Sequence, residues 1–599
     1  MHDENVTENG NVNGNGNQNR PATPPETPAE PAEPAPAKPA TPEQGTAEQV
    51  KRDRNGRGGE MRRAAAPVPA LARLKGLSGA VGGILAAALL AAAGGGLVAA
   101  SALSPQVPGS RALEAPLTAV PAGNSVGICP GPARLLEGAP VGTDPQFSPE
   151  SATAKSAVNA VVLSSSAGVL PGSRLAALTG SPLVELAKPA AASATPSPAP
   201  AAPALRAGVV PQRAVDAVSV LSADAQGNQQ PSAGAVMSYT AADGDLRGTA
   251  AAACQRPAND LWLVGANTAV GRTAVLNLSN ASGTPATVSL DLYGAKGPIQ
   301  APGSRGLLVA PGSTRSVILA GLAPGQEQLS VRVRSTGGPV AAVIQQSVLR
   351  GLTAGGVDFI SPGTAPATRQ AIAGLDLQDP AALAALAAKP GFADAKPALQ
   401  ITVPGAADAV VEVKLFGRDG QKPLPGGGVV TAKAGAVTEV SLAGVPAGHY
   451  TLAASSDVSF AAAARVTRGL KAEEAADFAW ASSSARLGSQ HVVPVPATGA
   501  RFLVFGAPEG RATISYTPVT ADGRVRAAAT ADIAGGTTTS VKVPADIEGS
   551  PLVGYLVSAA GGAAYGAVLL EEDNKADVST VPVAPGAAGQ EQVPVILGH

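Results

Sequence analysis

The stretch VSLDLYG, at residues 288–294, decides the fold class of this chain. Its apolar residues Val288, Leu290 and Leu292 alternate with other side chains, which is the period of a β-strand with one buried face. VEVKLFG, at residues 411–417, has the same pattern. Segments of this kind, separated by turn signals, fill residues 113–572, so the sequence predicts a mainly β protein with antiparallel sheets.

The same landmarks return later in the chain, which indicates an internal duplication. LYG and LAG in one copy correspond to LFG and LAG in the next at an identical offset, and an RGL triplet followed by Asp-Phe occurs in both. Landmarks that recur in a fixed order are typical of repeated structural units. The matched segments are residues 292–294 and 415–417, 319–321 and 442–444, 350–352 and 468–470, and 358–359 and 477–478.

We expect each copy to be a β-sandwich of roughly 80–110 residues, the size of an immunoglobulin or fibronectin-like domain. Two clear copies and a fainter third cover residues 258–364, 399–482 and 495–572. In the first and last of these copies a Gly-Gly pair, at 337–338 and 561–562, separates two strand-like segments. This pattern predicts a tight hairpin turn.

The segments around these copies have weaker patterns. We expect an irregular β region over residues 113–257, interrupted by an Ala/Pro-rich insertion at 189–203, and a linker over residues 365–398. Asp379-Pro380 in this linker predicts a short helix, with Asp as the N-cap and Pro at the first helical position. Residues 573–599 are rich in Pro, Gly and Val and predict a loose tail.

An uncharged apolar run from Leu77 to Leu103 predicts a transmembrane helix. Basic residues gather before this run, and none follows it until Arg111, so the positive-inside rule places the N-terminus in the cytoplasm and the C-terminal region outside the cell. The alternative is a signal peptide cleaved after Ala102 in the Ala-Ser-Ala triplet at 100–102, which would give a secreted protein.

Residues 1–75 form the predicted cytoplasmic tail. Its Asn/Gly tract and its Pro/Ala/Thr/Glu tract cannot bury enough apolar surface to offset chain entropy, so we expect a disordered segment. The basic cluster at residues 51–63 fits attraction to anionic lipid head groups, or it acts as a topology signal alone.

The overall charge argues against one class of function. The 599 residues carry a formal net charge of −1, and only 15% of them are charged, so no global field attracts nucleic acid. Aromatic residues make up 3% of the chain, so Val, Leu, Ile and Ala must fill its cores.

The only two cysteines, Cys129 and Cys254, both follow the apolar run. An external location is oxidising, so this pair predicts one disulfide. A redox-active pair and two free thiols are the alternatives, and the absence of a C-x-x-C motif argues against the first.

No segment has a convincing catalytic or metal-binding pattern. GNSVG, at residues 123–127, matches G-x-S-x-G, but Pro130 and Pro132 block the helix that a nucleophile elbow at Ser125 requires. Zinc sites normally need clustered His or Cys ligands, and the histidines here are scattered. They are His2, His449, His491 and His599.

Three aspartates are candidates for the acid and base of a glycan hydrolase, which needs two carboxylates flanking the scissile bond. They are Asp260, Asp291 and Asp358, but their spacing selects no pair, and turn or solvent-facing roles account for them. The sequence therefore predicts no catalytic residue, no cofactor and no metal ligand.

A set of short motifs in the outer region resembles an uncharacterised actinobacterial family with a domain of unknown function. The resemblance implies a membrane-anchored or secreted envelope protein, often encoded beside an envelope glycosyltransferase, with no assigned catalytic residues. The motifs are CPGP (129–132), DGDLRG (243–248), LWLVGA (261–266), VGRTAVLNLSN (270–280), DLYG (291–294), VAPGSTRSV (309–317), QQSVLRGLTAGGVDF (345–359) and APATRQ (365–370).

The leading functional hypothesis is a non-enzymatic, single-pass cell-envelope protein with an external β-rich region that scaffolds or binds. Its expected partners are the membrane and an envelope glycan or protein, with no nucleic acid. The alternatives are an accessory subunit of envelope polysaccharide assembly and a carboxylate-dependent glycan hydrolase.

Overall fold

The computed structural model describes residues 117–120, 123–136, 150–189, 205–226, 229–469, 471, 475–572, 576–587 and 591–594. The chain divides into two compact units, residues 1–111 and 112–599, and every described residue belongs to the second. The predicted tail at 1–75 and the predicted transmembrane helix at 77–103 lie outside the described residues. In the part that is described, no helix combines the length and the apolar character needed to cross a membrane.

The described unit is mainly β, which confirms the prediction from the alternating patterns. Its strands form four consecutive modules, each built from two antiparallel sheets. The first module contains β2 (Ser125–Cys129), β3 (Lys155–Leu163), β4 (Ser173–Ala177), β5 (Pro182–Ala187), β6 (Ala207–Ala214), β7 (Ser219–Ala223), β8 (Ala233–Ala241) and β9 (Gly248–Ala253).

The second module holds the stretch that opens the sequence argument, which lies in its strand β12. It contains β10 (Asp260–Ala266), β11 (Arg272–Asn280), β12 (Ala286–Gly294), β13 (Gly297–Ile299), β14 (Leu307–Val309), β15 (Ser313–Ile318), the 3-10 turn η2 (Leu319–Gly321), β16 (Leu329–Gly337), β17 (Ala341–Arg350) and β18 (Thr353–Ile360).

The third and fourth modules contain the longest strands. The third contains β19 (Ala367–Leu377), α2 (Pro380–Ala387), η3 (Ala393–Ala395), β20 (Ala398–Thr402), β21 (Ala409–Gly417), β22 (Gly420–Lys422), η4 (Pro425–Gly428), β23 (Val429–Ala432), β24 (Val437–Ser441), β25 (Gly448–Arg468) and β26 (Asp477–Ser482). The fourth contains β27 (His491–Pro494), β28 (Ala500–Thr520), β29 (Ala529–Ile533), β30 (Thr537–Lys542), β31 (Asp546–Ile547), β32 (Ser550–Glu571) and β33 (Val578–Pro582). Separately, β1 (Leu117–Val120) pairs with β34 (Glu591–Pro594).

The strand order repeats from module to module. We call one sheet of each module its inner sheet. From the first module to the fourth, the strand orders of the inner sheets are β6-β3-β8-β9, β15-β11-β17-β18, β24-β20-β25-β26 and β30-β28-β32-β33. The other sheet of each module is its outer sheet. In the same order of modules, the strand orders of the outer sheets are β2-β7-β4-β5, β10-β16-β12-β13, β19-β25-β21-β22 and β27-β32-β28-β29. The first module therefore shares the topology of the three that the sequence repeat identified.

Each module encloses a core between its two sheets, as the alternation in the sequence requires. In β12, Val288, Leu290 and Leu292 are buried, while Ser289 and Asp291 between them remain partly accessible. The buried side chains of β12 join those of β11 and β17 from the facing sheet in one apolar cluster. At roughly 1.5–3 kcal/mol for each fully buried aliphatic side chain, this face holds the module together.

The Gly-Gly pairs do not form hairpins, so that prediction is wrong. In the fourth module, β32 runs unbroken through the predicted turn at 561–562 and pairs with one sheet in its first half and with the other in its second. In the second module, the strands on either side of 337–338, β16 and β17, belong to different sheets. The long strand β25 of the third module passes between the two sheets in the same way as β32. Gly337 (φ 83°) and Gly561 (φ 88°) lie where the chain bends between the sheets. A Cβ atom on Gly337 would lie 2.3 Å from the carbonyl oxygen of Pro285, so only glycine fits this corner.

Several sequence-based boundaries also differ from the structure. Residues 113–257, expected to be irregular, contain two regular sheets, and the 365–398 linker contains β19, a strand of the third outer sheet. Residues 573–599, expected to be loose, include β33, which pairs with β32. These strands were missed because they are short, or rich in Ala and Gly, and lack clear alternation. The short helix is confirmed as α2, with Asp379 accepting a hydrogen bond from the backbone N–H of Ala382.

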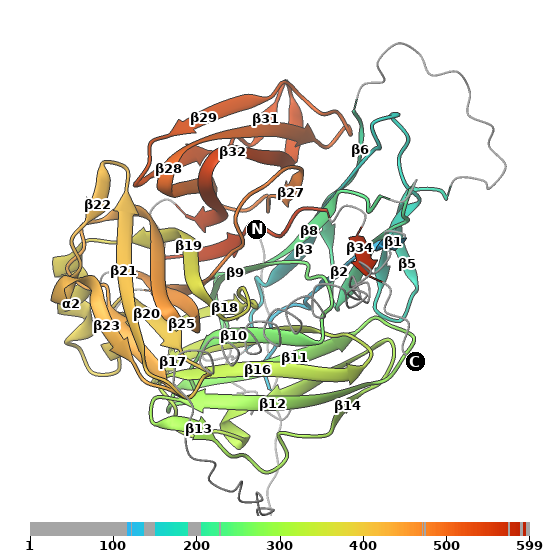
Figure 1. Cartoon of the computed structure of the whole chain (residues 1–599). Helices are drawn as coiled ribbons and strands as arrows, with labels where there is room; N and C mark the ends of the chain where they lie inside the picture. Colours follow the sequence, from blue (N-terminus) through green and yellow to red (C-terminus); the bar gives the residue numbers. More distant parts are fainter. Residues whose placement is uncertain are drawn as a thin grey trace, which may run out of the picture. The chain divides into compact units, whose positions relative to one another are not determined.

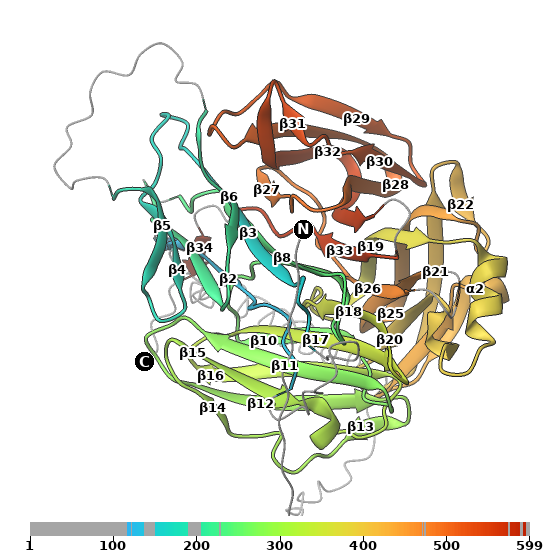
Figure 2. The ribbon, with the colours of Figure 1, turned by 180° about the vertical axis from the view of Figure 1, so that it is seen from behind.

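The modules form a closed, propeller-like ring (Figures 1 and 2). The last strand of each module lies innermost, and we call these four the axial strands: β9, β18, β26 and β33. β9 contacts β18, β18 contacts β26, β26 contacts β33, and β33 returns to β9. The ring therefore closes by packing between the first module and the fourth, which are far apart in the sequence.

Arginines in the segments that lead into the axial strands reach carboxylates of another module. Arg350 pairs with Asp394 of the third module at 3.1 Å. Arg468 pairs with Glu571 of the fourth. Arg247, in the first module, lies 3.2 Å from Asp577, just before β33. The RGL repeat seen in the sequence thus includes two residues, Arg350 and Arg468, that link neighbouring modules.

Candidate functional site

One buried carboxylate collects hydrogen bonds from all four axial strands. Asp477, the first residue of β26, accepts from the backbone N–H groups of Thr249 (2.9 Å), Val357 (3.2 Å), Phe478 (3.0 Å) and Val578 (3.3 Å). These donors belong to β9, β18, β26 and β33. Burial raises the pKa of Asp477 well above its usual range, although the N–H donors oppose this.

Two glycines make room for this carboxylate. A Cβ atom on Gly356 would lie 2.3 Å from Oδ1 of Asp477, and one on Gly248 would lie 2.8 Å from the same atom. Both glycines also have positive φ angles, 112° and 140°, which other residues rarely adopt. Backbone conformation and space therefore fix glycine at both positions, one in β18 and one in β9.

A second aspartate lies buried among the axial strands. Asp358 in β18 accepts a hydrogen bond from the backbone N–H of Trp480 in β26 (2.6 Å) and another from the Ser579 hydroxyl in β33 (3.3 Å). The Ser579 hydroxyl in turn accepts from the N–H of Ala251 in β9 (3.0 Å). Burial raises the pKa of Asp358 to about 7, against these hydrogen bonds. Both aspartates thus join all four modules.

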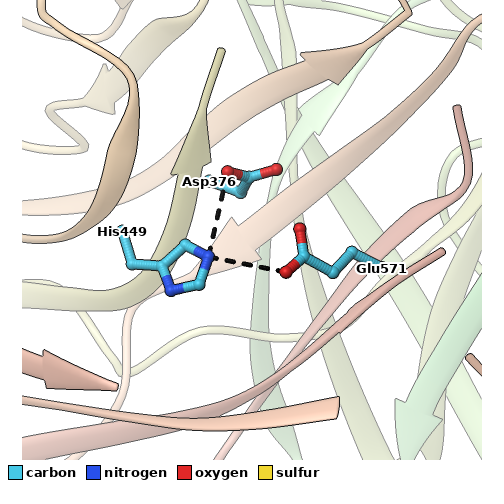
Figure 3. Close-up of side chains that lie close together, drawn as sticks. All are labelled: Asp376, His449 and Glu571. Atoms are coloured by element: carbon cyan, nitrogen blue, oxygen red, sulfur yellow. Dashed lines mark ion pairs between the residues drawn. The ribbon is translucent and has the colours of Figure 1, made fainter. Parts of the chain in front are cut away.

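A separate group of ionisable side chains lies where the third and fourth modules meet. Figure 3 shows Asp376 of β19, His449 of β25 and Glu571 of β32 converging. His449 Nε2 lies 3.7 Å from Glu571 Oε1 and 4.0 Å from Asp376 Oδ1. Arg468 Nη1 bonds to the other oxygen of each carboxylate, with 3.3 Å to Asp376 Oδ2. We call these four residues the interface cluster.

The electrostatics of the interface cluster differ between its two carboxylates. Burial raises the pKa of Asp376, and the charges of Arg468 and His449 only partly offset this. Burial also acts to raise the pKa of Glu571, but hydrogen bonds and charges from His449 and Arg468 outweigh it and hold that pKa below its usual range. The side chain of Ser540 fixes the imidazole through a 2.9 Å contact to His449 Nδ1.

Asp376, His449 and Glu571 are the described residues that could hold a metal ion, because their ligand atoms lie within 4.8 Å of one another. One imidazole and two carboxylates suit Zn²⁺ in principle. However, the Arg468 guanidinium already contacts both carboxylates, and it would repel a divalent cation placed between them. The donor set therefore fits an ion-pair network between two modules better than it fits a metal centre.

A cavity of about 300 Å³ lies at the C-terminal ends of the axial strands. Segments that directly follow each axial strand line it, together with parts of β2, β8 and β27, and most of its surface is apolar. The four lining segments are residues 253–256, 361–364, 483–485 and 582–585. Because the strands are brought together only by ring closure, all four modules contribute to this axial cavity.

The polar groups around the axial cavity fall into two sets. Gln255, Thr364 and Ser483 hydrogen-bond to neighbouring protein groups. In contrast, the buried Ser484 hydroxyl has no hydrogen-bond partner among the described residues. The Arg256 side chain is exposed and, within the described part of the chain, makes no ion pair or hydrogen bond that would neutralise it. Because the Ser484 Oγ is itself fully buried, Arg256 is the group available to a ligand.

The predicted disulfide between Cys129 and Cys254 is confirmed. Cys129 ends β2, an edge strand of the first outer sheet, and Cys254 follows β9, the edge strand of the first inner sheet. The bond therefore ties the two sheets of the first module together, and Cys254 also lines the axial cavity.

Ser125 does not lie at a strand-to-helix turn. It is the first residue of β2, and a strand follows it where a nucleophile elbow requires a helix. Its side chain borders the axial cavity, but no histidine does so among the described lining residues. The G-x-S-x-G match therefore has no elbow geometry.

The three candidate hydrolase carboxylates lie in two different places. Asp260 pairs with Arg332, at 2.6 Å, and Asp291 pairs with Arg334, at 2.9 Å, on the outer sheet of the second module. Asp358 is buried among the axial strands instead. The carboxylates that do converge, Asp376 and Glu571, were not singled out from the sequence, and the distance between them along the chain leaves no local signal.

A propeller-like ring of four repeated β modules, with a mostly apolar cavity at its axis, defines the class of this protein. The chain belongs to a family of unknown function, DUF5719, whose model matches residues 209–544. This confirms the expected membership of an uncharacterised family. The match starts within β6 and ends just after β30, so it spans the second and third modules completely. No curated protein and no solved structure matches the chain.

Proposed function

We propose that the protein is a non-enzymatic, single-pass cell-envelope protein whose β-rich ring, outside the membrane, binds partner molecules. The axial cavity carries the proposal, because ligand sites are typically concave, mostly apolar and equipped with a few polar groups. The disulfide supports an oxidising location. An envelope protein or glycan on the outer surface of the ring is the expected macromolecular partner.

The proposal includes the parts of the chain that lie before the ring. Residues 77–103 anchor the protein in the membrane, residues 1–75 form a disordered cytoplasmic tail, and the ring consists of tandem β-sandwich-like modules in the envelope of an actinobacterium. The shared strand order of the four modules supports their origin by duplication. The charge asymmetry around the apolar run supports the orientation.

Tag accessibility on intact cells tests the location. We expect a tag after residue 599 to be labelled from outside, and a tag at residue 1 to be labelled only after the membrane is permeabilised. Release of the ring into the medium, with a new N-terminus after Ala102, would establish the cleaved alternative. Labelling of neither tag on intact cells, with both labelled after permeabilisation, would contradict the proposal.

A role as an accessory subunit of envelope polysaccharide assembly is the alternative that the family resemblance suggests. It predicts that deletion of the gene changes the amount or composition of the envelope polysaccharide. An unchanged polysaccharide profile in the deletion strain would contradict this alternative and leave the binding proposal in place.

A further inference from the structure

The axial cavity combines a mostly apolar lining with one available charged group, and this combination points to one ligand chemistry. Most of its accessible lining is apolar, from residues such as Val126, Leu221, Leu261 and Val493. None of the described lining residues carries a carboxylate, and Arg256 is the only charged residue among them. A ligand with an apolar body and one negative charge complements both features.

The size of the cavity limits the length of this ligand. A volume near 300 Å³ lies at the small end of the range for small-molecule sites, about 300–1,000 Å³. A short alkyl chain of about eight carbons with a carboxylate head group suits a site of this size. Its tail would displace water from the apolar walls, and its head would remain near the Arg256 guanidinium.

We propose that the axial cavity binds a medium-chain carboxylate, with the alkyl chain between the four modules and the carboxylate on Arg256. The assignment rests on the proposed function and names the ligand class of its site. The cavity is lined by residues from all four modules, so binding also reports on ring closure. Octanoate is the matching probe.

Calorimetric titration of the full-length protein in lipid nanodiscs with octanoate tests the assignment, with empty nanodiscs as the blank. We expect saturable binding of one octanoate, weakened about 10- to 100-fold by Arg256→Gln, because a hydrogen bond to a charged group is lost. Arg305→Gln, at an exposed arginine away from the cavity, is the matched control and should bind as the unaltered protein does. Octylamine should not bind in the cavity.

Ser484→Ala is a second control. It should raise the midpoint of thermal unfolding of the free protein, because an unsatisfied hydroxyl is removed, and leave octanoate binding unchanged, because the Ser484 Oγ is fully buried. Absence of saturable octanoate binding, equal binding of octylamine, or equal affinity in Arg256→Gln would each overturn the ligand assignment. The tag experiment is independent of these outcomes, so external labelling with no octanoate binding would refute only the ligand class.

Discussion

The axial strands and the interface cluster bury carboxylates in two different ways. Around the axis, Asp477 accepts hydrogen bonds from backbone N–H groups of four strands, and no arginine among the described residues bonds to it. At the interface, the Arg468 guanidinium supplies positive charge to Asp376 and Glu571, and the His449 imidazole lies beside both carboxylates. The axial carboxylate bonds to backbone groups, whereas the interface carboxylates bond to other side chains.

The comparison also explains why the pKa of Glu571 shifts in the opposite direction from the pKa values of Asp477, Asp358 and Asp376. Neutral N–H donors do not offset the cost of burying a charge, so the pKa of Asp477 rises well above normal and that of Asp358 rises to about 7. At the interface, a full positive charge lowers the pKa of Glu571 despite burial. Burying a charged carboxylate is unfavourable. The axial aspartates avoid this cost by binding a proton, whereas Glu571 offsets it by ion pairing.

Asp477→Ala should have the largest effect. It leaves four backbone N–H groups, one in each axial strand, without their acceptor, and each buried unsatisfied donor costs about 1–3 kcal/mol. We expect a loss of at least about 4 kcal/mol in the free energy of unfolding, measured by chemical denaturation. Asp457→Ala, at an exposed position of β25, is the control. A similar small change in both variants would show that the axial hydrogen bonds are not important for stability.

Arg468→Met should come second. The substitution removes the guanidinium and leaves Asp376 and Glu571 facing each other, and breaking a buried ion pair typically costs about 3–5 kcal/mol. Lys433→Met, which breaks the exposed pair with Asp408, is the matched control and should leave the unfolding midpoint nearly unchanged. If Arg468→Met were as harmless as the control, the cluster would not hold the third and fourth modules together.

Asp358→Asn should change the pH dependence of stability. The folded-state pKa, about 7, exceeds the unfolded value of about 3.9, so the stabilising contribution of this group is complete below about pH 4 and is lost as pH rises through about 7. Relative to the unaltered protein, the Asn variant should therefore gain up to roughly 1.4 kcal/mol per pH unit between these values. Denaturant midpoints across this range measure the difference, and a difference that does not vary with pH would refute the buried, proton-binding role.

Zn²⁺ should have the smallest effect. Because Arg468 already contacts both carboxylates of the interface cluster, excess Zn²⁺ should not raise the thermal unfolding midpoint. His449→Gln serves as the comparison, since it removes the nitrogen ligand. A Zn²⁺-dependent rise that this substitution abolishes would show that the cluster is a metal site after all.

Patterns of a few consecutive residues predicted many of the strands and the short helix correctly. The alternation at 288–294 and at 411–417 identified real strands, and Asp379-Pro380 identified a real helix start, because side-chain period and capping are properties of a few consecutive residues. The Gly-Gly pairs were misread, because a bend between two sheets and a hairpin both need glycine. Only the pairing partners of the flanking strands distinguish them.

The sequence by itself determined the β class, the repeat and the single disulfide, since these follow from periodicity, spacing and a cysteine count of two. The tertiary structure alone decided that the modules close into a ring. It also decided that Asp477 meets four strands, that Asp376 and Glu571 converge on Arg468, and that Arg256 borders a cavity. The physical reason is that each of these features joins residues of different modules, and such contacts leave no trace in local sequence spacing.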